Sequence, residues 1–128
     1  MQPLEGFRVL DLTHVLAGPC ATHHLRCLGA EVIKIERPGT GDPMRALSLQ
    51  PEQQGVPPGF RALNAGKKSV VIDLATDEGR AAVLRLADSA DVFLDTFRTG
   101  VARRHVLASA ASRAGRPLIG HCSPPRSV

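Results

Sequence analysis

Residues that can bind a phosphate group occur in turns that follow short apolar runs. Residues 95–100 (DTFRTG) combine an arginine, a glycine and the expected start of a helix. Arginine donates charge-assisted hydrogen bonds to phosphate oxygens, and the free N–H groups at the start of a helix attract anions. An earlier turn at Gly18 and Pro19 lies between an apolar run and a short helix. Both turns predict a site for a phosphate-bearing ligand.

A cluster of potential metal ligands lies on the expected first helix. Cys20, His24 and Cys27 are spaced at i, i+4 and i+7, so they share one face. No fourth ligand is evident, and a free cysteine often serves as a small apolar residue. We therefore expect no metal site. With Cys122 the cysteines number three and lack CxxC spacing, which argues against a disulfide framework.

A β-α-β unit is expected to position the earlier turn. The apolar runs at residues 9–12 and 32–35 predict strands, because each is too short for a helix and the second is β-branched. A helix between them begins with Pro19, whose missing N–H is not needed there, and ends before Gly29. Residues 39–60 are rich in glycine, proline and glutamine and indicate a long loop.

A second β-α-β unit follows this loop. Residues 69–74 and 92–94 predict strands, and Thr76 caps a helix between them. The helix buries one face, with apolar residues at positions 83, 86, 87 and 90. Alternating strands and helices predict an α/β fold with a mostly parallel sheet. Ligands are then expected at the carboxyl ends of the strands, which fall at residues 13–18, 36–39, 73–76 and 95–100.

Size and charge narrow the classes of protein. The chain has 128 residues, enough for one domain, and no apolar run or leader that would indicate a membrane span or export. We expect a soluble protein of the cytoplasm or an organelle matrix, with no membrane partner. The net charge is +4, but six arginines and no acidic residue follow residue 97. That tail lacks aromatic residues and DNA-binding motifs, so we expect no nucleic-acid partner.

Four segments in order are similar to the family III CoA-transferases, the CaiB/BaiF group, which also includes acyl-CoA racemases. They are LEGFRVLDLTHVLAGPCAT, LGAEVIKIERPGTGDPMR, LNAGKKSVVIDLATDEGR and ADVFLDTFRTGV. The resemblance implies a Rossmann-like parallel sheet with helices on both faces, incomplete relative to the full family fold. It divides the chain into a partial CoA-binding α/β domain at residues 1–104 and a divergent or truncated basic tail at 105–128.

The resemblance also implies a set of CoA contacts. Carried over by position, they are Val15, Leu16, Arg37, Ile72, Asp73, Thr96, Phe97, Arg98 and Arg104. The three arginines suit the 3′-phosphate and the pyrophosphate, and Val15 and Phe97 suit the adenine or the pantetheine. Thr96 departs from the family's usual asparagine, and Thr99 from its usual proline.

Structural roles are the alternative for several of these residues. Val15, Ile72 and Phe97 fit a hydrophobic core equally well, and Arg37 could pair with Glu36 or another carboxylate. Lys67 and Lys68 could add positive charge at the mouth of the site, or form a solvated turn.

The resemblance implies transfer of CoA from an acyl-CoA thioester to a carboxylic acid, through an aspartate nucleophile. The family's nucleophile lies beyond the last residue here, so no catalytic residue is assigned, and we expect the chain to be inactive alone. Full-length relatives form homodimers. The chain is then the CoA-binding part of a transferase, or a non-catalytic remnant or nucleotide-binding module that pairs with a full-length partner. An altered reading frame, an alternative exon or a truncated gene would each explain its ending. A dehydrogenase is disfavoured because GxGxxG is missing from the first turn.

Overall fold

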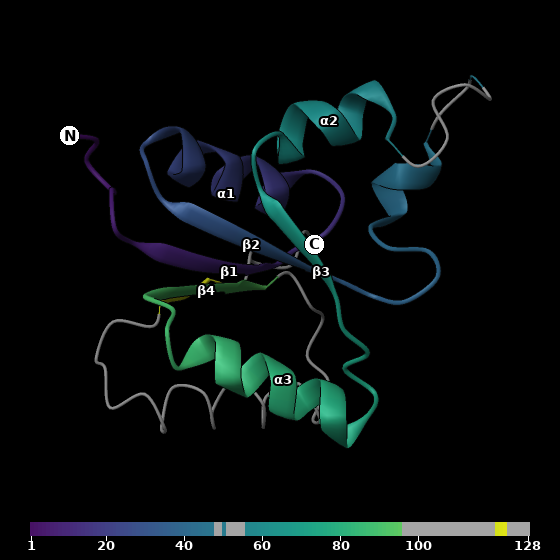
Figure 1. Cartoon of the computed structure of the whole chain (residues 1–128). Coiled ribbons are helices and arrows are strands. Elements are labelled where there is room, and N and C mark those ends of the chain that lie inside the picture. The colour runs from purple at the N-terminus through teal and green to yellow at the C-terminus, as the bar shows by residue number, and fades with distance from the viewer. Residues whose placement is uncertain (48–49, 51–55, 96–119, 123–128) are drawn as a thin grey trace, which may run out of the picture.

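A computed structural model describes residues 1–47, 50, 56–95 and 120–122 of the chain (Figure 1). Its elements are β1 (Arg8–Leu12), α1 (Ala17–Cys27), β2 (Glu31–Glu36), the 3₁₀ helix η1 (Pro43–Ala46), α2 (Pro58–Asn64), β3 (Lys68–Val71), α3 (Asp77–Ala87), β4 (Val92–Asp95) and β5 (Gly120–Cys122). Within the described ranges, no helix combines the length and apolarity that crossing a membrane requires.

The strands form one sheet in the order β3-β2-β1-β4-β5, and every neighbouring pair is parallel. β1 lies at the centre, where Leu10 is in register with Ile33 of β2 and Phe93 of β4. The chain moves outward from β1 to β2 and β3, then returns to the other side of β1 as β4. The carboxyl ends of β1 and β4 therefore form a topological switch point, where α/β sheets commonly bind ligands.

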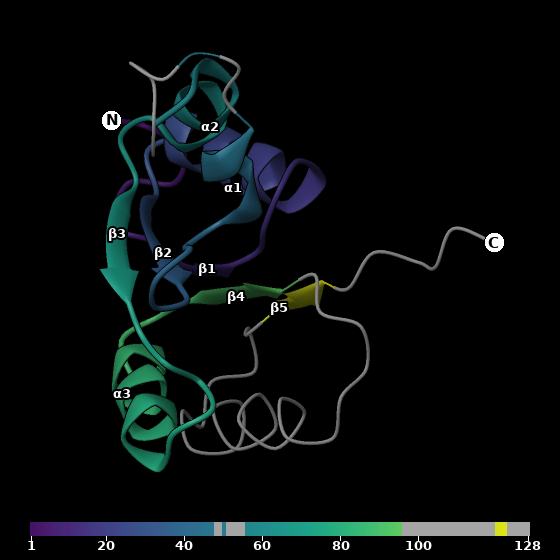
Figure 2. The ribbon, with the colours of Figure 1, turned by 90° about the vertical axis from the view of Figure 1, so that its right-hand side faces the viewer.

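Helices cover both faces of the sheet, as Figures 1 and 2 show from two directions. α1 and α2 lie on one side, called here the α1 face, and α3 lies on the other, the α3 face. Alternate residues of each strand point to opposite faces. Leu10 and Phe93 pack with Val83 of α3, whereas Val9 and Val32 form a second cluster with Leu25 of α1. The predicted Rossmann-like α/β fold is thus confirmed.

The predicted helices form, with one boundary displaced. α1 begins at Ala17, so Pro19 is its third residue and not its first; this is tolerated because the opening N–H groups of a helix have no partner within it. Gly29 follows α1 with φ of +108°, as expected for a helix end. Thr76 caps α3, and its Oγ1 accepts a 3.0 Å hydrogen bond from Gly79 N.

Two expectations about extents were wrong, and one strand was not predicted. The stretch at residues 39–60 is not simply a loop, because it contains η1 and the start of α2. Asp42 makes η1 possible, since its carboxylate caps Met44 N at 2.9 Å. The third strand ends at Val71 and not at residue 74. Finally, β5 adds a strand at Gly120–Cys122 that the sequence pattern did not indicate.

Candidate functional site

The β1–α1 turn, residues 13–16, lies at the switch point and exposes apolar side chains. Val15 is 41% exposed and Leu16 is 59% exposed. Val15 has φ of +69°, the left-handed region, and is the only non-glycine residue with positive φ among those that the structure describes. This conformation costs a β-branched residue on the order of 1–3 kcal/mol. Such strain persists only where surrounding contacts enforce it.

A buried ion pair fixes the backbone of this turn. Val15 N donates a 3.0 Å hydrogen bond to Asp42 Oδ1. Asp42 Oδ2 lies 2.8 Å from Lys34 Nζ, and both side chains are almost fully buried. Lys34 Nζ also donates to Thr13 O at 2.9 Å. Burial alone would raise the pKa of Asp42, but the Lys34 ammonium and two backbone N–H groups hold that pKa below its usual range.

A second buried pair lies beneath the start of α1. Lys67 Nζ is 3.0 Å from Asp11 Oδ2 and 2.7 Å from the hydroxyl of Thr22. Burial lowers the pKa of Lys67, and the nearby Asp11 carboxylate partly offsets this effect. Lys68 is exposed and pairs with Glu31 at the amino end of the sheet. The expectation that Lys67 and Lys68 add positive charge at the mouth of the site, or form a solvated turn, is therefore wrong for Lys67, which is buried. Lys68 is exposed as a solvated residue would be, but it lies at the amino edge of the sheet and not at the mouth of the site.

Glu36 anchors η1 to the end of β2. Its carboxylate accepts two 2.7 Å hydrogen bonds from Arg45, one from Asp42 N at 2.9 Å and one from Ser69 Oγ at 2.8 Å. Burial by itself would raise the pKa of Glu36, but these donors, with Arg45 foremost, lower it to about 2. Glu36 is therefore ionised at neutral pH, and its main charged partner is Arg45.

Arg37 follows Glu36 and is exposed at the carboxyl end of β2. Its Nε donates a 3.1 Å hydrogen bond to Gly41 O. Gly41 precedes Asp42, so one short segment connects Arg37 with the residue that holds Val15. The structure thus places Arg37, Val15 and Leu16 at the carboxyl ends of adjacent strands.

Ile72 and Asp73 lie one strand farther out, after β3. Ile72 is half-buried, packs against the core of the α3 face, and donates from its N–H to Glu36 O at 2.9 Å. Asp73 is exposed, and its Oδ1 accepts from Ala75 N at 2.9 Å in the turn before α3. Both have clear structural roles. The other predicted contacts, Thr96, Phe97, Arg98 and Arg104, lie outside the described residues.

Sequence reasoning missed three residues of this region. His14 lies within the β1–α1 turn; burial first, and then Lys34, lower its pKa, which favours a neutral imidazole. Lys34 and Asp42 together hold the turn. A signal for Lys34 was present, because a lysine inside the apolar strand EVIKIE needs a buried anionic partner. The partner itself lies in the stretch that was expected to be a loop.

The sequence pattern of CoA-transferase family III matches residues 4–124. The chain belongs to CoA-transferase family III. The predicted resemblance is confirmed. The match continues past residue 104, the expected limit of the α/β domain, and includes β5.

Relatives in this family carry the names of several CoA-transferases. The chain is 44% identical over 118 residues to the probable fatty acyl-CoA transferase Rv3272 of Mycobacterium tuberculosis, covering 92% of this chain and 30% of that protein. It is 46% identical over 100 residues to the succinyl-CoA:glutarate CoA-transferase of Mus musculus, covering 78% and 23%. This family III chain therefore spans about a third or less of the length of these relatives.

Solved structures show the same family III fold. A crystal structure of Rv3272 superimposes with a TM-score of 0.80 at 42% identity, covering 94% of this chain and 33% of that one. A CAIB/BAIF family protein from Brucella suis gives a TM-score of 0.82 at 36% identity, covering 95% and 33%. The arrangement of strands and helices described above is thus that of the amino-terminal third of these family members.

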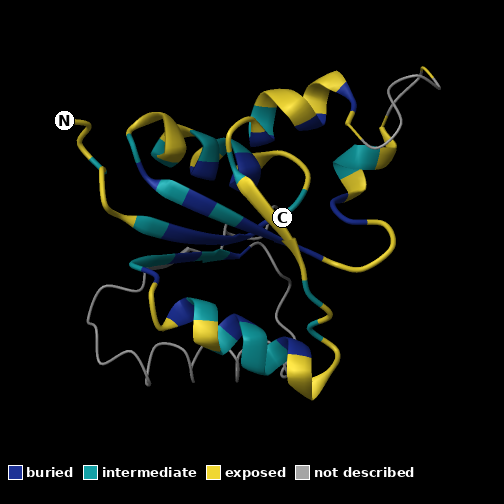
Figure 3. Cartoon of the chain, in the orientation of Figure 1, coloured by how far each residue is buried: buried dark blue, intermediate teal, exposed yellow. Residues whose placement is uncertain are grey.

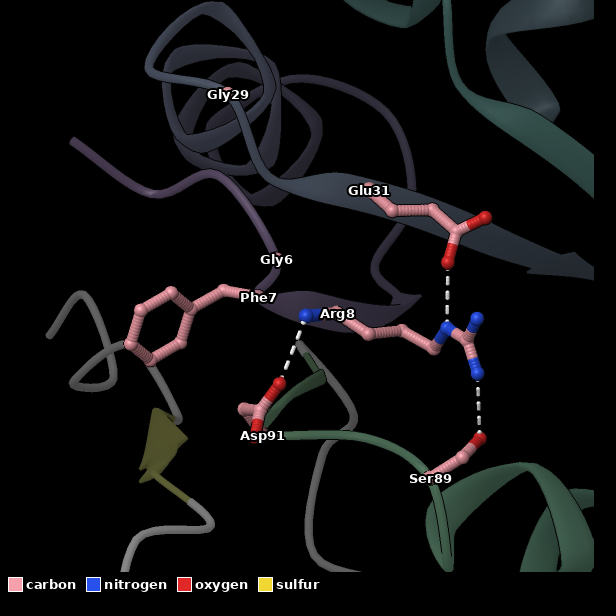
Figure 4. A pocket seen from close by; sticks show the side chains of 7 residues that line it. All are labelled: Gly6, Phe7, Arg8, Gly29, Glu31, Ser89 and Asp91. Carbon is pink, nitrogen blue, oxygen red and sulfur yellow. Dashed lines mark hydrogen bonds and ion pairs between the residues drawn. The ribbon is translucent and has the colours of Figure 1, made fainter. Parts of the chain in front are cut away.

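The family III chain also has a hollow of about 560 Å³ at the amino ends of its strands (Figure 4). Its polar groups pair with one another. Arg8 Nε contacts Glu31 Oε2 at 2.5 Å, Arg8 Nη1 donates to Ser89 Oγ at 2.8 Å, and Arg8 N donates to Asp91 Oδ2 at 2.9 Å. This edge is opposite the β1–α1 turn. Among the described residues, no group of three or more potential ligands could hold a metal ion.

Proposed function

We propose that this chain is the CoA-binding part of a family III CoA-transferase, which transfers CoA between an acyl-CoA thioester and a carboxylic acid. One observation carries the proposal: the β1–α1 turn presents two exposed apolar side chains at the switch point of the sheet. The backbone of the turn is strained at Val15 and is held there by a hydrogen bond to the buried Asp42 carboxylate. Family membership and the names of the relatives support CoA as the ligand.

Three features of this edge suit the chemistry of CoA. Val15 and Leu16 offer apolar area to the adenine or the pantetheine. Arg37 offers an exposed guanidinium for a phosphate. α1 starts without a side-chain cap and without an acidic residue in its first turn, so its positive end is not neutralised there. Arg98 and Arg104 are proposed to add further charge from residues beyond those described.

The carboxylates described at this edge hold the fold together and are not offered as nucleophiles. Asp11, Glu36 and Asp42 are buried and paired with Lys67, Arg45 and Lys34. Asp73 organises the turn before α3. We therefore propose that this chain binds CoA, and that the covalent steps require residues it does not contain. As in the expectation from sequence, the proposed setting is a homodimer in the cytoplasm or an organelle matrix.

Calorimetry with CoA tests the proposal directly. The purified chain is expected to bind CoA saturably, and dephospho-CoA more weakly. The Arg37→Ala variant is expected to bind CoA about tenfold or more weakly, because a charge-assisted hydrogen bond to phosphate contributes roughly 1.5–3 kcal/mol.

The matched control is Arg85→Ala, which removes an exposed arginine from α3 on the opposite face. Its affinity for CoA should equal that of the unmodified chain. If calorimetry shows no saturable heat at millimolar CoA, the binding function is refuted. Equal affinity of the Arg37→Ala variant and the unmodified chain would remove only Arg37 from the site. Label exchange between acyl-CoA and acid should be undetectable with this chain alone.

A further inference from the structure

We propose that Lys34 and Asp42 act as positioning residues, whose buried ion pair locks Val15 in its left-handed conformation and so shapes the β1–α1 turn for its ligand. The inference rests on the proposed function, because CoA is taken to be that ligand. Neither side chain is exposed enough to touch a ligand itself. Their effect must therefore pass through the backbone that they hold.

The pair grips the turn at two points. Lys34 Nζ holds Thr13 O at 2.9 Å, and Asp42 Oδ1 holds Val15 N at 3.0 Å. The 2.8 Å contact between Lys34 and Asp42 links the two points. His14, between them, thus has a fixed backbone on both sides. A change of φ at Val15 rotates the peptide that carries its N–H relative to the chain that leads into α1. Because α1 is packed against the sheet, such a rotation would break the bond to Asp42 or move a fully buried carboxylate.

Asp42 is itself held from several directions, which makes it a rigid support. Its N–H donates to Glu36 Oε2 at 2.9 Å, and its Oδ1 also caps Met44 N at 2.9 Å. Glu36 in turn is bound by Arg45. The contacts therefore run from β2 through η1 to the β1–α1 turn. A valine would leave the left-handed region if this support were removed, because negative φ is much less strained for a β-branched residue.

Two substitutions at Asp42 separate positioning from general stability. Asp42→Asn keeps an oxygen that can accept from Val15 N, whereas Asp42→Ala removes it. We expect Asp42→Ala to weaken CoA binding roughly tenfold, and Asp42→Asn by no more than about threefold. The control is Val83→Ala on the α3 face, where Val83 is fully buried. It should lower the thermal midpoint of unfolding without changing the affinity of the folded chain for CoA.

A double-mutant cycle of Val15→Gly and Asp42→Ala, measured by thermal unfolding, tests without a ligand whether Asp42 holds Val15 in the left-handed conformation. Glycine adopts positive φ freely, so Val15→Gly should relieve strain and raise the midpoint of unfolding in the chain that retains Asp42. In the Asp42→Ala background the turn has already relaxed, and the same substitution should give no increase. In CoA titrations, Asp42→Ala should cost less affinity when position 15 is glycine.

The outcomes distinguish this inference from the proposed function. A chain that binds no CoA refutes the function, and the unfolding cycle then still decides whether the lock exists. Equal effects of Val15→Gly in both backgrounds would overturn the lock. If CoA binds and affinity falls equally for Asp42→Asn and Asp42→Ala, in proportion to lost stability, then the pair has only a structural role. Unchanged affinity in Asp42→Ala would overturn positioning outright.

Discussion

Buried charged residues give the carboxyl edge of this sheet its shape. Asp11, Lys34 and Glu36 all point to the α1 face, and each pairs with a residue distant in sequence or on another element. Removing one member of such a pair leaves an uncompensated charge on a buried side chain. The identities of these residues are therefore constrained by their partners, and the exposed residues beside them remain available for a ligand.

The pair of Glu36 and Arg45 predicts an acid-sensitive fold. The pKa of Glu36 falls from the ordinary value of 4.5 to about 2. Because the folded-state pKa is lower than the unfolded one, the carboxylate stabilises the fold above about pH 4.5 and loses this effect as the pH falls toward 2. The full contribution is about 3 kcal/mol.

Glu36→Gln should therefore lower the free energy of unfolding at pH 7 by about 1–3 kcal/mol. It should also flatten the decline in stability between pH 5 and pH 3, as measured by urea denaturation at each pH. Glu78→Gln, at an exposed position of α3, should change stability by less than about 0.5 kcal/mol. An equally steep decline in the Glu36→Gln variant would show that other groups cause the acid sensitivity.

The regular elements were largely predictable because short-range signals specify them. β-branched runs gave β2, Thr76 marked the start of α3, and Gly29 marked the end of α1. η1 and α2 were not predictable in the same way, since both are short and lie in a segment rich in proline and glycine. Their formation depends on contacts between residues that are distant in sequence. Arg45 of η1 pairs with Glu36, which lies outside the segment, and the same guanidinium lies 3.9 Å from the centre of the Phe60 ring in α2.

The cap of α3 gives a prediction for a single helix. Thr76→Ala removes the 3.0 Å hydrogen bond to Gly79 N and should lower the free energy of unfolding by about 1 kcal/mol. Thr76→Ser keeps the hydroxyl and should cost only a fraction of that amount. Urea denaturation at pH 7 measures both. Similar losses for alanine and serine would mean that the methyl group of Thr76, and not its hydroxyl, stabilises the helix start.

For the molecule as a whole, the pattern of strands predicted the sheet but not how charge is distributed across it. Lys67 and Lys68 show why. They are adjacent in sequence, yet one is buried against Asp11 and the other is exposed beside Glu31. Composition cannot distinguish two neighbouring lysines, because the difference arises only when β3 pairs with β2.

The edge of the sheet predicts self-association of the isolated chain. All four residues of β3 are exposed (Figure 3), and Val71 is 65% exposed. An exposed apolar edge strand can pair with the edge of another molecule. Val71→Lys should therefore reduce self-association, measured by light scattering over a concentration series. Val71→Thr, which keeps a β-branched shape without charge, is the control. Equal scattering by the lysine variant and the unmodified chain would place the association elsewhere.

Apolar contacts hold the α3 face of the sheet to its helix. On the α1 face, near the carboxyl ends of the strands, buried ion pairs have this role. On the α3 face, Leu10, Val83 and Phe93 can each be exchanged for an apolar residue of similar volume at modest cost. On the α1 face, replacing Lys34 or Asp11 by an uncharged residue leaves its partner with a buried, unpaired charge. Among related sequences, substitutions on the α3 face should therefore occur one at a time, whereas those on the α1 face should occur in compensating pairs. We expect correlated variation between positions 34 and 42, and between positions 11 and 67.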